Sequence, residues 1–334
     1  MRSKLHIRTV ESHTEGMPTR VVTGGVAPIP GATMSERRDW AKINLEALRG
    51  LLMFEPRGHA SMSGAILMSP TRADADWGVL YIEATGFLPM CGHGTMGVAT
   101  VLVETGLVEV TEPITTIRLD TPAGLVIARV ETCDGRAVRV TVENVPALVL
   151  GLDQSVETPT FGTVQYDMVY GGNFYPVVDV TQLGLDISVQ CKEDLMAAGH
   201  QIAAAINETN PPEHPQNSSI RKLHHVQFTT PWQAPPAVAL NAVFSLPGYF
   251  DRSPCGTGTS ARMACLHARG QLAVGERFVN SSMIGSRFEG CILRTEEIAG
   301  HVAVIPEVSG RAWVTGTADY MLDPDDPFAA GFIL

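Results

Sequence analysis

Two short stretches decide the fold of this 334-residue chain: Cys91-Gly92-His93-Gly94-Thr95 and Cys255-Gly256-Thr257-Gly258-Thr259. Both read Cys-Gly-x-Gly-Thr, and about half of the chain separates them. A stretch compatible with a helix follows each one and ends at a glycine fifteen residues after the cysteine, at Gly106 and at Gly270. Self-similarity of this kind predicts two related halves, each with a Cys-Gly loop at the N-terminus of a helix.

A loop of this composition suits an anion and a reactive thiol. Glycine lets the backbone approach a ligand closely, and the first N–H groups of a helix lack intrahelical acceptors, so a carboxylate can bind there. The same partial positive charge favours thiolate, which lowers a cysteine pKa from about 8.5 towards neutrality. If the two halves face each other across a cleft, Cys91 and Cys255 can act as base and acid on opposite faces of one carbon. Such a reaction inverts a carbon that bears an acidic proton, and we expect it to need neither a metal nor a cofactor.

The composition predicts a globular protein of about two domains with a small-molecule partner. With 45% hydrophobic and 18% charged residues, the chain is not disordered as a whole. Its net charge of −11 and its lack of Lys or Arg runs argue against nucleic-acid binding. No apolar stretch approaches the ~18 residues of a transmembrane helix, and the N-terminus lacks the apolar run of a signal peptide. We therefore expect a cytoplasmic protein without membrane contacts.

Short strands punctuated by turns are predicted over much of the chain, with a boundary near residue 150. The strands are expected at residues 78–83, 116–119, 125–130, 137–142, 164–170, 175–180, 225–230 and 237–244. Asp134-Gly135 predicts a hairpin between two of them. Two further helices are predicted, one from a Ser35 cap to a point before Pro56 and one over residues 192–207. The first would carry an apolar stripe of Trp40, Ile43, Leu48 and Leu51.

Along essentially its whole length the sequence resembles the proline racemase family. The stretches that carry the resemblance are His13-Thr14 with Pro18-Thr19-Arg20-Val21-Val22, Pro56-Arg57-Gly58-His59, Met90 to Thr95, Gly171-Gly172-Asn173-Phe174-Tyr175, Asp251 to Thr259, and Asp323 to Phe328. The resemblance implies an α/β (α+β) fold like that of diaminopimelate epimerase, with two pseudo-symmetric halves, each a curved, mostly antiparallel sheet around a central helix. We expect the halves at residues 1–148 and 149–314, with a C-terminal tail of about 315–334 that packs back on the first.

The resemblance also implies the site residues. Cys91 and Cys255 would be the acid/base pair, and Asp251 and His225 would hold the ring nitrogen of an imino acid, since a secondary ammonium needs an acceptor or a counter-charge. The residues implied at the substrate carboxylate are Gly92, His93, Gly256 and Thr257. No metal ligand is implied, and His13, His59 and Glu15 show no metal-ligand spacing.

The activity implied by the resemblance is cofactor-independent epimerisation at C2 of 4-hydroxyproline, from the trans-L to the cis-D isomer. Family members that dehydrate trans-3-hydroxyproline typically carry Thr at the position of Cys255, so two cysteines favour epimerisation. Proline racemisation is the near alternative, and dehydration of trans-3-hydroxyproline is another. The chain has Glu15-Gly16-Met17 where the family often has Gly-Gly-Glu, which leaves the preferred ring substituent open. The sequence also leaves a homodimer open.

Other classes of function remain as alternatives. A thiol-dependent hydrolase or transferase would use one cysteine as a nucleophile, and a binding module would use the loops for affinity alone. A turn at Asp251-Arg252-Ser253-Pro254 and a core role for His225 are the structural alternatives. Burial without reactivity is expected for the other cysteines, Cys133, Cys191, Cys265 and Cys291. It is not expected for the two in the loops, because burial does not require flanking glycines or their recurrence.

Overall fold

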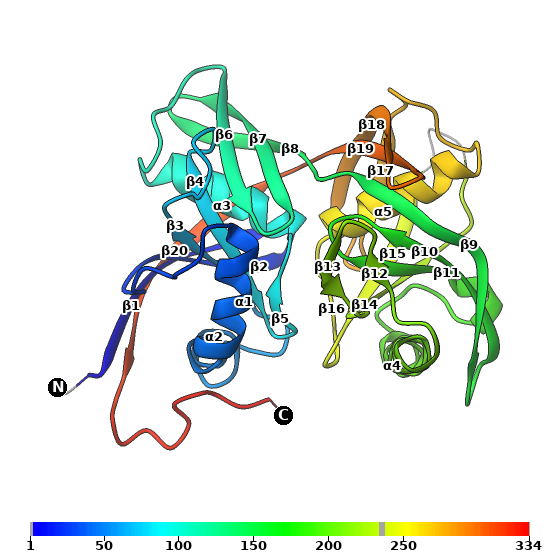
Figure 1. The fold of residues 1–334 in the computed structure, drawn as a ribbon, viewed down its shortest axis with the longest axis horizontal. Helices are drawn as coiled ribbons and strands as arrows, with labels where there is room; N and C mark the ends of the chain where they lie inside the picture. Colours follow the sequence, from blue (N-terminus) through cyan, green and yellow to red (C-terminus); the bar gives the residue numbers. More distant parts are fainter. Residues whose placement is uncertain (1–2, 234–237, 334) are drawn as a thin grey trace. The chain divides into compact units, whose positions relative to one another are not determined.

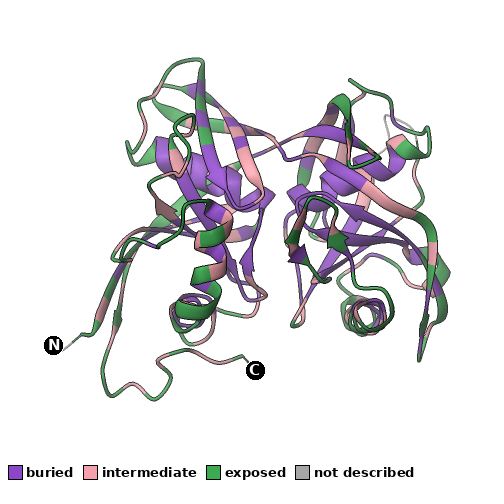
Figure 2. Cartoon of the chain, in the orientation of Figure 1, coloured by how far each residue is buried: buried purple, intermediate pink, exposed green. Residues whose placement is uncertain are grey.

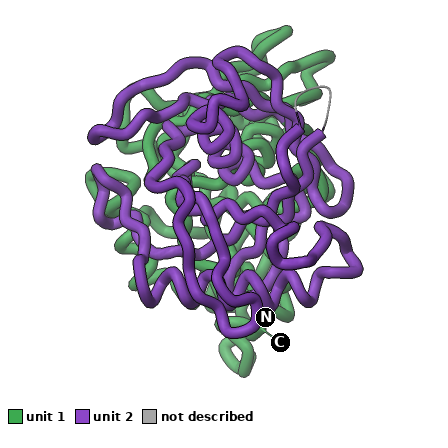
Figure 3. Tube along the Cα trace, turned by 90° about the vertical axis from the view of Figure 1, so that its right-hand side faces the viewer, with its two compact units in different colours: residues 1–142, 310–334 green, residues 143–309 purple. Residues whose placement is uncertain are grey.

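The structure is a computed structural model that describes residues 3–233 and 238–333. The chain forms two compact units (Figure 3): unit 1 comprises Met1–Val142 and Gly310–Leu334, and unit 2 comprises Glu143–Ser309. Figure 1 labels the helices and strands of both. No helix in the described part of the chain is long and apolar enough to cross a membrane.

Unit 1 combines a mostly antiparallel sheet with three helices. Its elements are β1 (Leu5–Thr14), β2 (Met17–Gly24), α1 (Met34–Asn44), α2 (Glu46–Met53), β3 (Ser63–Met68), β4 (Trp77–Glu83), β5 (Gly86–Leu88), α3 (Gly92–Glu104), β6 (Ile114–Thr121), β7 (Gly124–Cys133), β8 (Arg136–Glu143) and β20 (Ala312–Leu322). Strand β1 pairs with both β2 and β20, so the end of the chain returns to the first strand of the unit.

Unit 2 is built in the same way. Its elements are β9 (Ala147–Thr158), β10 (Gly162–Tyr170), β11 (Phe174–Asp179), the 3-10 helix η1 (Val180–Leu183), α4 (Lys192–Thr209), β12 (Glu213–His214), β13 (Asn217–Arg221), β14 (His225–Thr229), β15 (Ala239–Ser245), β16 (Tyr249–Phe250), α5 (Gly256–Ala268), β17 (Phe278–Ser281), β18 (Arg287–Ile298) and β19 (His301–Gly310). Residue 237, the expected start of one strand, lies outside the described residues.

Five strand pairings of unit 1 have counterparts in unit 2. In unit 1, β2 is parallel to β3, β3 is antiparallel to β4, β4 pairs with β5 and is parallel to β6, and β6 is antiparallel to β7. In unit 2, β11 is parallel to β14, β14 is antiparallel to β15, β15 pairs with β16 and is parallel to β17, and β17 is antiparallel to β18. The α+β fold with two similar halves that the sequence predicted is therefore confirmed.

Helices α3 and α5 occupy equivalent places and are the central helices of their units. Every residue of α3 from Gly92 to Val103 is buried, as are ten of the thirteen residues of α5. Figure 2 shows both helices largely in the colour of buried residues. A helix that is apolar or small all round can be buried on every side. Both helices end as expected, because Gly106 and Gly270 follow with φ of 69° and supply the left-handed residue that commonly terminates a helix.

The expected single helix after Ser35 is wrong in two respects. Thr33 caps it, because its side chain accepts a hydrogen bond from the N–H of Glu36. The segment also breaks at Leu45, which ends α1 and precedes α2 with φ −118° and ψ 14°. Because of this break, the predicted apolar stripe does not face the core along its whole length. Leu51 of α2 packs in the core, while Ile43 of α1 is 82% exposed. The helix expected at residues 192–207 is confirmed as α4, with its apolar stripe buried.

A close contact beneath α5 gives a first prediction. A Cβ at Gly171, in the turn between β10 and β11, would lie 2.3 Å from the carbonyl oxygen of Thr257 and 2.8 Å from the nitrogen of Ala261. These are backbone atoms that cannot rotate away, so we expect Gly171→Ala to lower the free energy of unfolding by about 1–3 kcal/mol. Urea denaturation measures the free energy of unfolding of both proteins. Gly316→Ala is the control, since a Cβ there meets nothing within 4 Å, and an equal loss in both variants would contradict the steric argument.

Candidate active site

In unit 1, Cys91 is the N-cap of helix α3. Its sulfur accepts a hydrogen bond from the N–H of Gly94 at 3.4 Å, and only 3% of the residue is exposed. A Cβ at Gly94 would lie 2.9 Å from this sulfur, so the glycine is needed for the approach. The sequence motif therefore places the thiol on the positive end of a buried helix.

A network of polar side chains surrounds Cys91. Its sulfur lies 3.4 Å from Oε1 of Glu83 and 3.5 Å from Nδ1 of His93. Ser63 connects the two: its hydroxyl donates to Oε1 of Glu83 at 3.2 Å and lies 3.0 Å from Nε2 of His93. The carboxylate, thiol and imidazole donor atoms all lie within 4.8 Å of one another, which makes them the candidate metal ligands of this unit. The sequence did not point to Ser63 or Glu83.

In unit 2, Cys255 is the N-cap of helix α5. Its sulfur accepts a hydrogen bond from the N–H of Gly258 at 3.3 Å. The hydroxyl of Tyr175 lies 3.4 Å from the same sulfur and 2.6 Å from the hydroxyl oxygen of Thr257. Tyr175 thus lies in the position of a hydrogen-bond donor to the sulfur. The sequence indicates Tyr175 only as the last residue of a stretch that resembles the family.

The loop before Cys255 holds a strained backbone. Cys255 has φ 63°, in the left-handed region that costs a non-glycine residue about 1–3 kcal/mol. The N–H of Cys255 donates to the hydroxyl of Ser253 at 3.1 Å, and Oδ1 of Asp251 accepts from both the N–H and the hydroxyl of Ser253 at 2.8 Å. Asp251 therefore fixes the turn that presents the thiol, whatever else it binds.

His225 lies beside Tyr175 in the same unit. The two rings stack with centroids 5.4 Å apart, and Nδ1 of His225 is 2.8 Å from the hydroxyl of Ser245. Its Nε2 is buried and, among the described residues, has no hydrogen-bond partner. Burial, together with the neighbouring His224, lowers the pKa of His225 to about 3, so this imidazole is neutral at physiological pH.

The electrostatics of the free site hold Cys255 as a thiol. Burial raises its pKa to about 12, and the negative charge of Asp251 acts in the same direction. The hydrogen bonds from Tyr175, from the N–H of Gly258 and from Thr257 lower the pKa, because each stabilises the thiolate, but they do not outweigh burial. Burial and Asp251 therefore oppose the lowering of the Cys255 pKa that the sequence predicts from the helix N-terminus, and the N–H of Gly258 acts in the predicted direction.

The structure gathers the sequence-predicted residues into two groups. Unit 1 holds Cys91, Gly92 and His93 at the start of α3, and unit 2 holds the remaining members around the start of α5: His225, Asp251, Cys255, Gly256 and Thr257.

Of the other cysteines, Cys265 is buried as expected. The expectation is wrong for the remaining three, because Cys133 is exposed at the hairpin turn after β7 and Cys191 and Cys291 are partly exposed.

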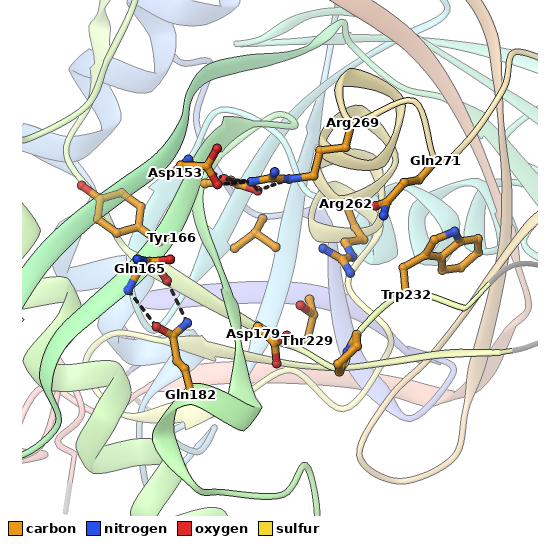
Figure 4. A pocket seen from close by; sticks show the side chains of 13 residues that line it. Asp153, Gln165, Tyr166, Asp179, Gln182, Thr229, Trp232, Arg262, Arg269 and Gln271 are labelled. Atoms are coloured by element: carbon orange, nitrogen blue, oxygen red, sulfur yellow. Dashed lines mark hydrogen bonds and ion pairs between the residues drawn. The ribbon is translucent and has the colours of Figure 1, made fainter.

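A cavity of about 370 Å³ lies elsewhere in unit 2 (Figure 4). It is lined by Arg262 of α5, by residues just after that helix and by residues of the strands β10 and β11. Arg269, which also faces it, is already paired with Asp153 at 2.8 Å and Asp167 at 2.7 Å, the contacts drawn as dashed lines. None of the predicted site residues lines this cavity, so it is separate from the thiol of Cys255.

Known proteins resemble this chain in sequence and in fold. The family model described as "Proline racemase" matches residues 9–333. A protein of Streptosporangium roseum named 4-hydroxyproline 2-epimerase is 58% identical over 334 residues, which cover 100% of both chains. A proline racemase of Clostridioides difficile is 39% identical and also covered in full. The crystal structure of a hydroxyproline epimerase from Agrobacterium vitis, with bound trans-4-hydroxy-L-proline, is 36% identical with a TM-score of 0.96, covering 100% of this chain and 96% of that one.

The hydrogen bond from Tyr175 gives a prediction about the reactivity of Cys255. Removing the hydroxyl withdraws a donor from the thiolate and raises the thiol pKa further. At pH 9 we expect Tyr175→Phe to slow alkylation of Cys255 by iodoacetamide about two- to tenfold, as one hydrogen bond allows. Peptide mass spectrometry gives the rate. Tyr166→Phe is the matched control in the same unit, and an unchanged or faster reaction in Tyr175→Phe would contradict the assignment.

Proposed function

This chain belongs to the proline racemase family, and on that premise we propose that it is an isomerase that inverts C2 of 4-hydroxyproline, interconverting trans-4-hydroxy-L-proline and cis-4-hydroxy-D-proline. The observation that carries the proposal is the repeated geometry of the two cysteines. Each caps a buried helix through its sulfur, with a backbone N–H as donor, in a unit of the same strand topology. One relative named for this reaction is 58% identical over the full length.

In the proposed mechanism the two sulfurs act on opposite faces of C2. One thiolate removes the C2 proton, the electron pair of the broken C–H bond moves towards the carboxylate, and the thiol of the other cysteine delivers its proton to the opposite face. The products are the inverted imino acid and a protein with exchanged protonation states of Cys91 and Cys255. The same groups run the reaction in reverse, and no cofactor takes part.

The substrate carboxylate would bind at the two helix N-termini. The N–H groups of Gly92, His93, Gly256 and Thr257 open α3 and α5, where helical acceptors are lacking. Charge builds up on this carboxylate when the proton leaves C2. Fixed N–H dipoles aimed at it are then worth more in the transition state than in the ground state, which is what accelerates a reaction.

His225 and Asp251 would hold the ring nitrogen. His225 is a neutral imidazole whose Nε2 has no partner among the described residues, so it can accept a hydrogen bond from a secondary ammonium. Asp251 supplies the counter-charge, and its own charge is one reason that the pKa of Cys255 is high. A cationic ring nitrogen beside Asp251 offsets that charge, so the arriving substrate itself favours the thiolate of Cys255.

The compartment follows from the thiols. No disulfide joins the six cysteines in the described part of the chain, and the proposed chemistry requires both loop cysteines to stay reduced. Thiols persist in the cytoplasm and tend to form disulfides outside it. We therefore place the reaction in the cytoplasm.

Proline is the second candidate substrate. The Clostridioides difficile relative, 39% identical over its full length, is named a proline racemase. The chemistry at C2 would be identical, and only the contacts with the ring substituent would differ.

Isotope exchange in deuterated water tests the proposal. Incubation with trans-4-hydroxy-L-proline, L-proline and trans-3-hydroxy-L-proline should give inversion with deuterium at C2, fastest for 4-hydroxyproline and without loss of water. Optical rotation and mass spectrometry follow the two events separately. Cys91→Ser and Cys255→Ser should each lower inversion at least about 10³-fold, since removal of an acid or base costs factors of this size.

Cys133→Ser is the matched control, because that cysteine is exposed and lies outside both loops. Full inversion by either loop variant would refute the two-base mechanism. A covalent acyl-thioester on Cys91 would instead support a thiol-dependent hydrolase, and ligand binding without exchange would support a binding module.

A further inference from the structure

We propose that Glu83, Cys91 and His93 form a Zn²⁺ site, which the ion occupies in competition with substrate. A thiolate, an imidazole and a carboxylate are the three ligand types that zinc takes from proteins. All three residues are buried, and within residues 3–233 and 238–333 they are the only three His, Cys, Asp or Glu residues gathered closely enough to share an ion.

The distances between the donor atoms match those of a zinc polyhedron. With zinc bonds of about 2.3 Å to sulfur and about 2.0–2.2 Å to nitrogen and oxygen, two ligand atoms of a tetrahedral site lie roughly 3.4–3.6 Å apart. The sulfur of Cys91 lies 3.4 Å from Oε1 of Glu83 and 3.5 Å from Nδ1 of His93. Two of these distances are thus close to those of a tetrahedral site before any ion binds, and the third pair of ligand atoms lies within 4.8 Å.

Ser63 selects the tautomer of His93 that such a site needs. Its hydroxyl hydrogen points to Oε1 of Glu83, so its oxygen accepts from Nε2–H of His93, 3.0 Å away. A neutral imidazole protonated at Nε2 leaves the lone pair of Nδ1 for the ion, and the sulfur of Cys91 lies within 3.6 Å of both ring nitrogens. Metal-binding histidines almost always have their second nitrogen held by such a hydrogen bond, and its loss typically weakens binding 10- to 100-fold.

The equivalent place in unit 2 lacks this ligand set. There the side chains within hydrogen-bond distance of the Cys255 sulfur are Tyr175 and Thr257, and neither hydroxyl is a usual zinc ligand. In the described part of the chain, Asp251 and His225 do not gather with this thiol closely enough to share an ion. The pair that corresponds in register to Ser63 and Glu83 is His225 and Ser245, which brings no carboxylate. The ion should therefore choose unit 1 although the two loops share one motif.

Binding exchanges a proton for the ion. The S–H bond of Cys91 breaks, its proton passes to the buffer, and a Zn–S bond forms with no change of oxidation state. Inhibition rests on the proposed function, because the ion would then remove one of the two acid/base sulfurs. Binding of the ion does not depend on the proposed function, and the experiments below measure binding and inhibition separately.

Alkylation of the wild-type protein tests occupation without any variant. With Zn²⁺ added, iodoacetamide should label Cys91 at least about tenfold more slowly, while the exposed Cys133 reacts at its usual rate. Peptide mass spectrometry reads both, and EDTA should restore the labelling of Cys91. Equal slowing at both cysteines would show that the ion merely consumes reagent or binds thiols at random, and would overturn the proposal.

Co²⁺ in place of Zn²⁺ identifies the ligands. One equivalent per chain should give a thiolate charge-transfer absorption that is lost in Cys91→Ser and weakened at least tenfold in Glu83→Gln and His93→Asn. Ser63→Ala, which removes only the hydrogen bond to His93, should weaken it about tenfold. Cys255→Ser is the matched control and should retain the absorption. Its loss there, or its persistence in Cys91→Ser, would overturn the assignment.

Activity is measured last. If 4-hydroxyproline is inverted, Zn²⁺ should inhibit competitively, and EDTA should reverse the inhibition. If no imino acid is inverted, the absorption and the protection of Cys91 still report the ion, so failure of the proposed function and failure of the metal site give different results.

Discussion

The site depends on one repeated interaction, a backbone N–H that donates to a cysteine sulfur at the start of a buried helix. The N–H of Gly94 donates this hydrogen bond to the sulfur of Cys91, and the N–H of Gly258 donates it to the sulfur of Cys255. An N-cap normally uses the oxygen of Ser, Thr, Asp or Asn, and a sulfur is a weaker acceptor. Glycine at the donor position lets the larger sulfur approach, since a Cβ at Gly258 would lie 3.1 Å from it. The capping role thus fixes each thiol beside the first N–H groups of a helix, which lack intrahelical acceptors.

Each unit surrounds this common cap with different side chains. Ser63 opens β3 and pairs with Glu83 at the end of β4, whereas His225 opens β14 and pairs with Ser245 at the end of β15. The same register therefore delivers a carboxylate to one thiol and, beside the other, a neutral imidazole stacked on Tyr175. Two-base catalysis requires one thiol and one thiolate at a time, and two chemically unlike surroundings give the protein a means of setting which sulfur holds the proton.

The sequence predicted the local features of the site, and it missed the residues that strand pairing brings to it. The Cys-Gly motifs, helices α3 and α5, and the glycines that end them lie within fifteen residues of a cysteine, so their spacing was enough. Glu83 and Ser63 reach Cys91 only through the pairing of β3 with β4, and the sequence predicted a strand at residues 78–83 but no partner strand at residues 63–68. The break at Leu45 was missed for a related reason. An apolar stripe can continue in helical spacing while the core accepts only part of it, as the exposure of Ile43 shows.

The unit 2 site carries a cost in stability that its chemistry explains. Nε2 of His225 and both polar atoms of the Gln227 amide are buried and have no hydrogen-bond partner in the described part of the chain. Each such group costs about 1–3 kcal/mol, and native proteins leave few of them. His225 and Gln227 lie on one face of β14, two residues apart, and Nε2 of Gln227 is 3.3 Å from the position of a Cβ on Gly258. With the left-handed backbone of Cys255, the cost is concentrated around one thiol. An imino acid bound as proposed would donate a hydrogen bond to Nε2 of His225 and so recover part of this free energy.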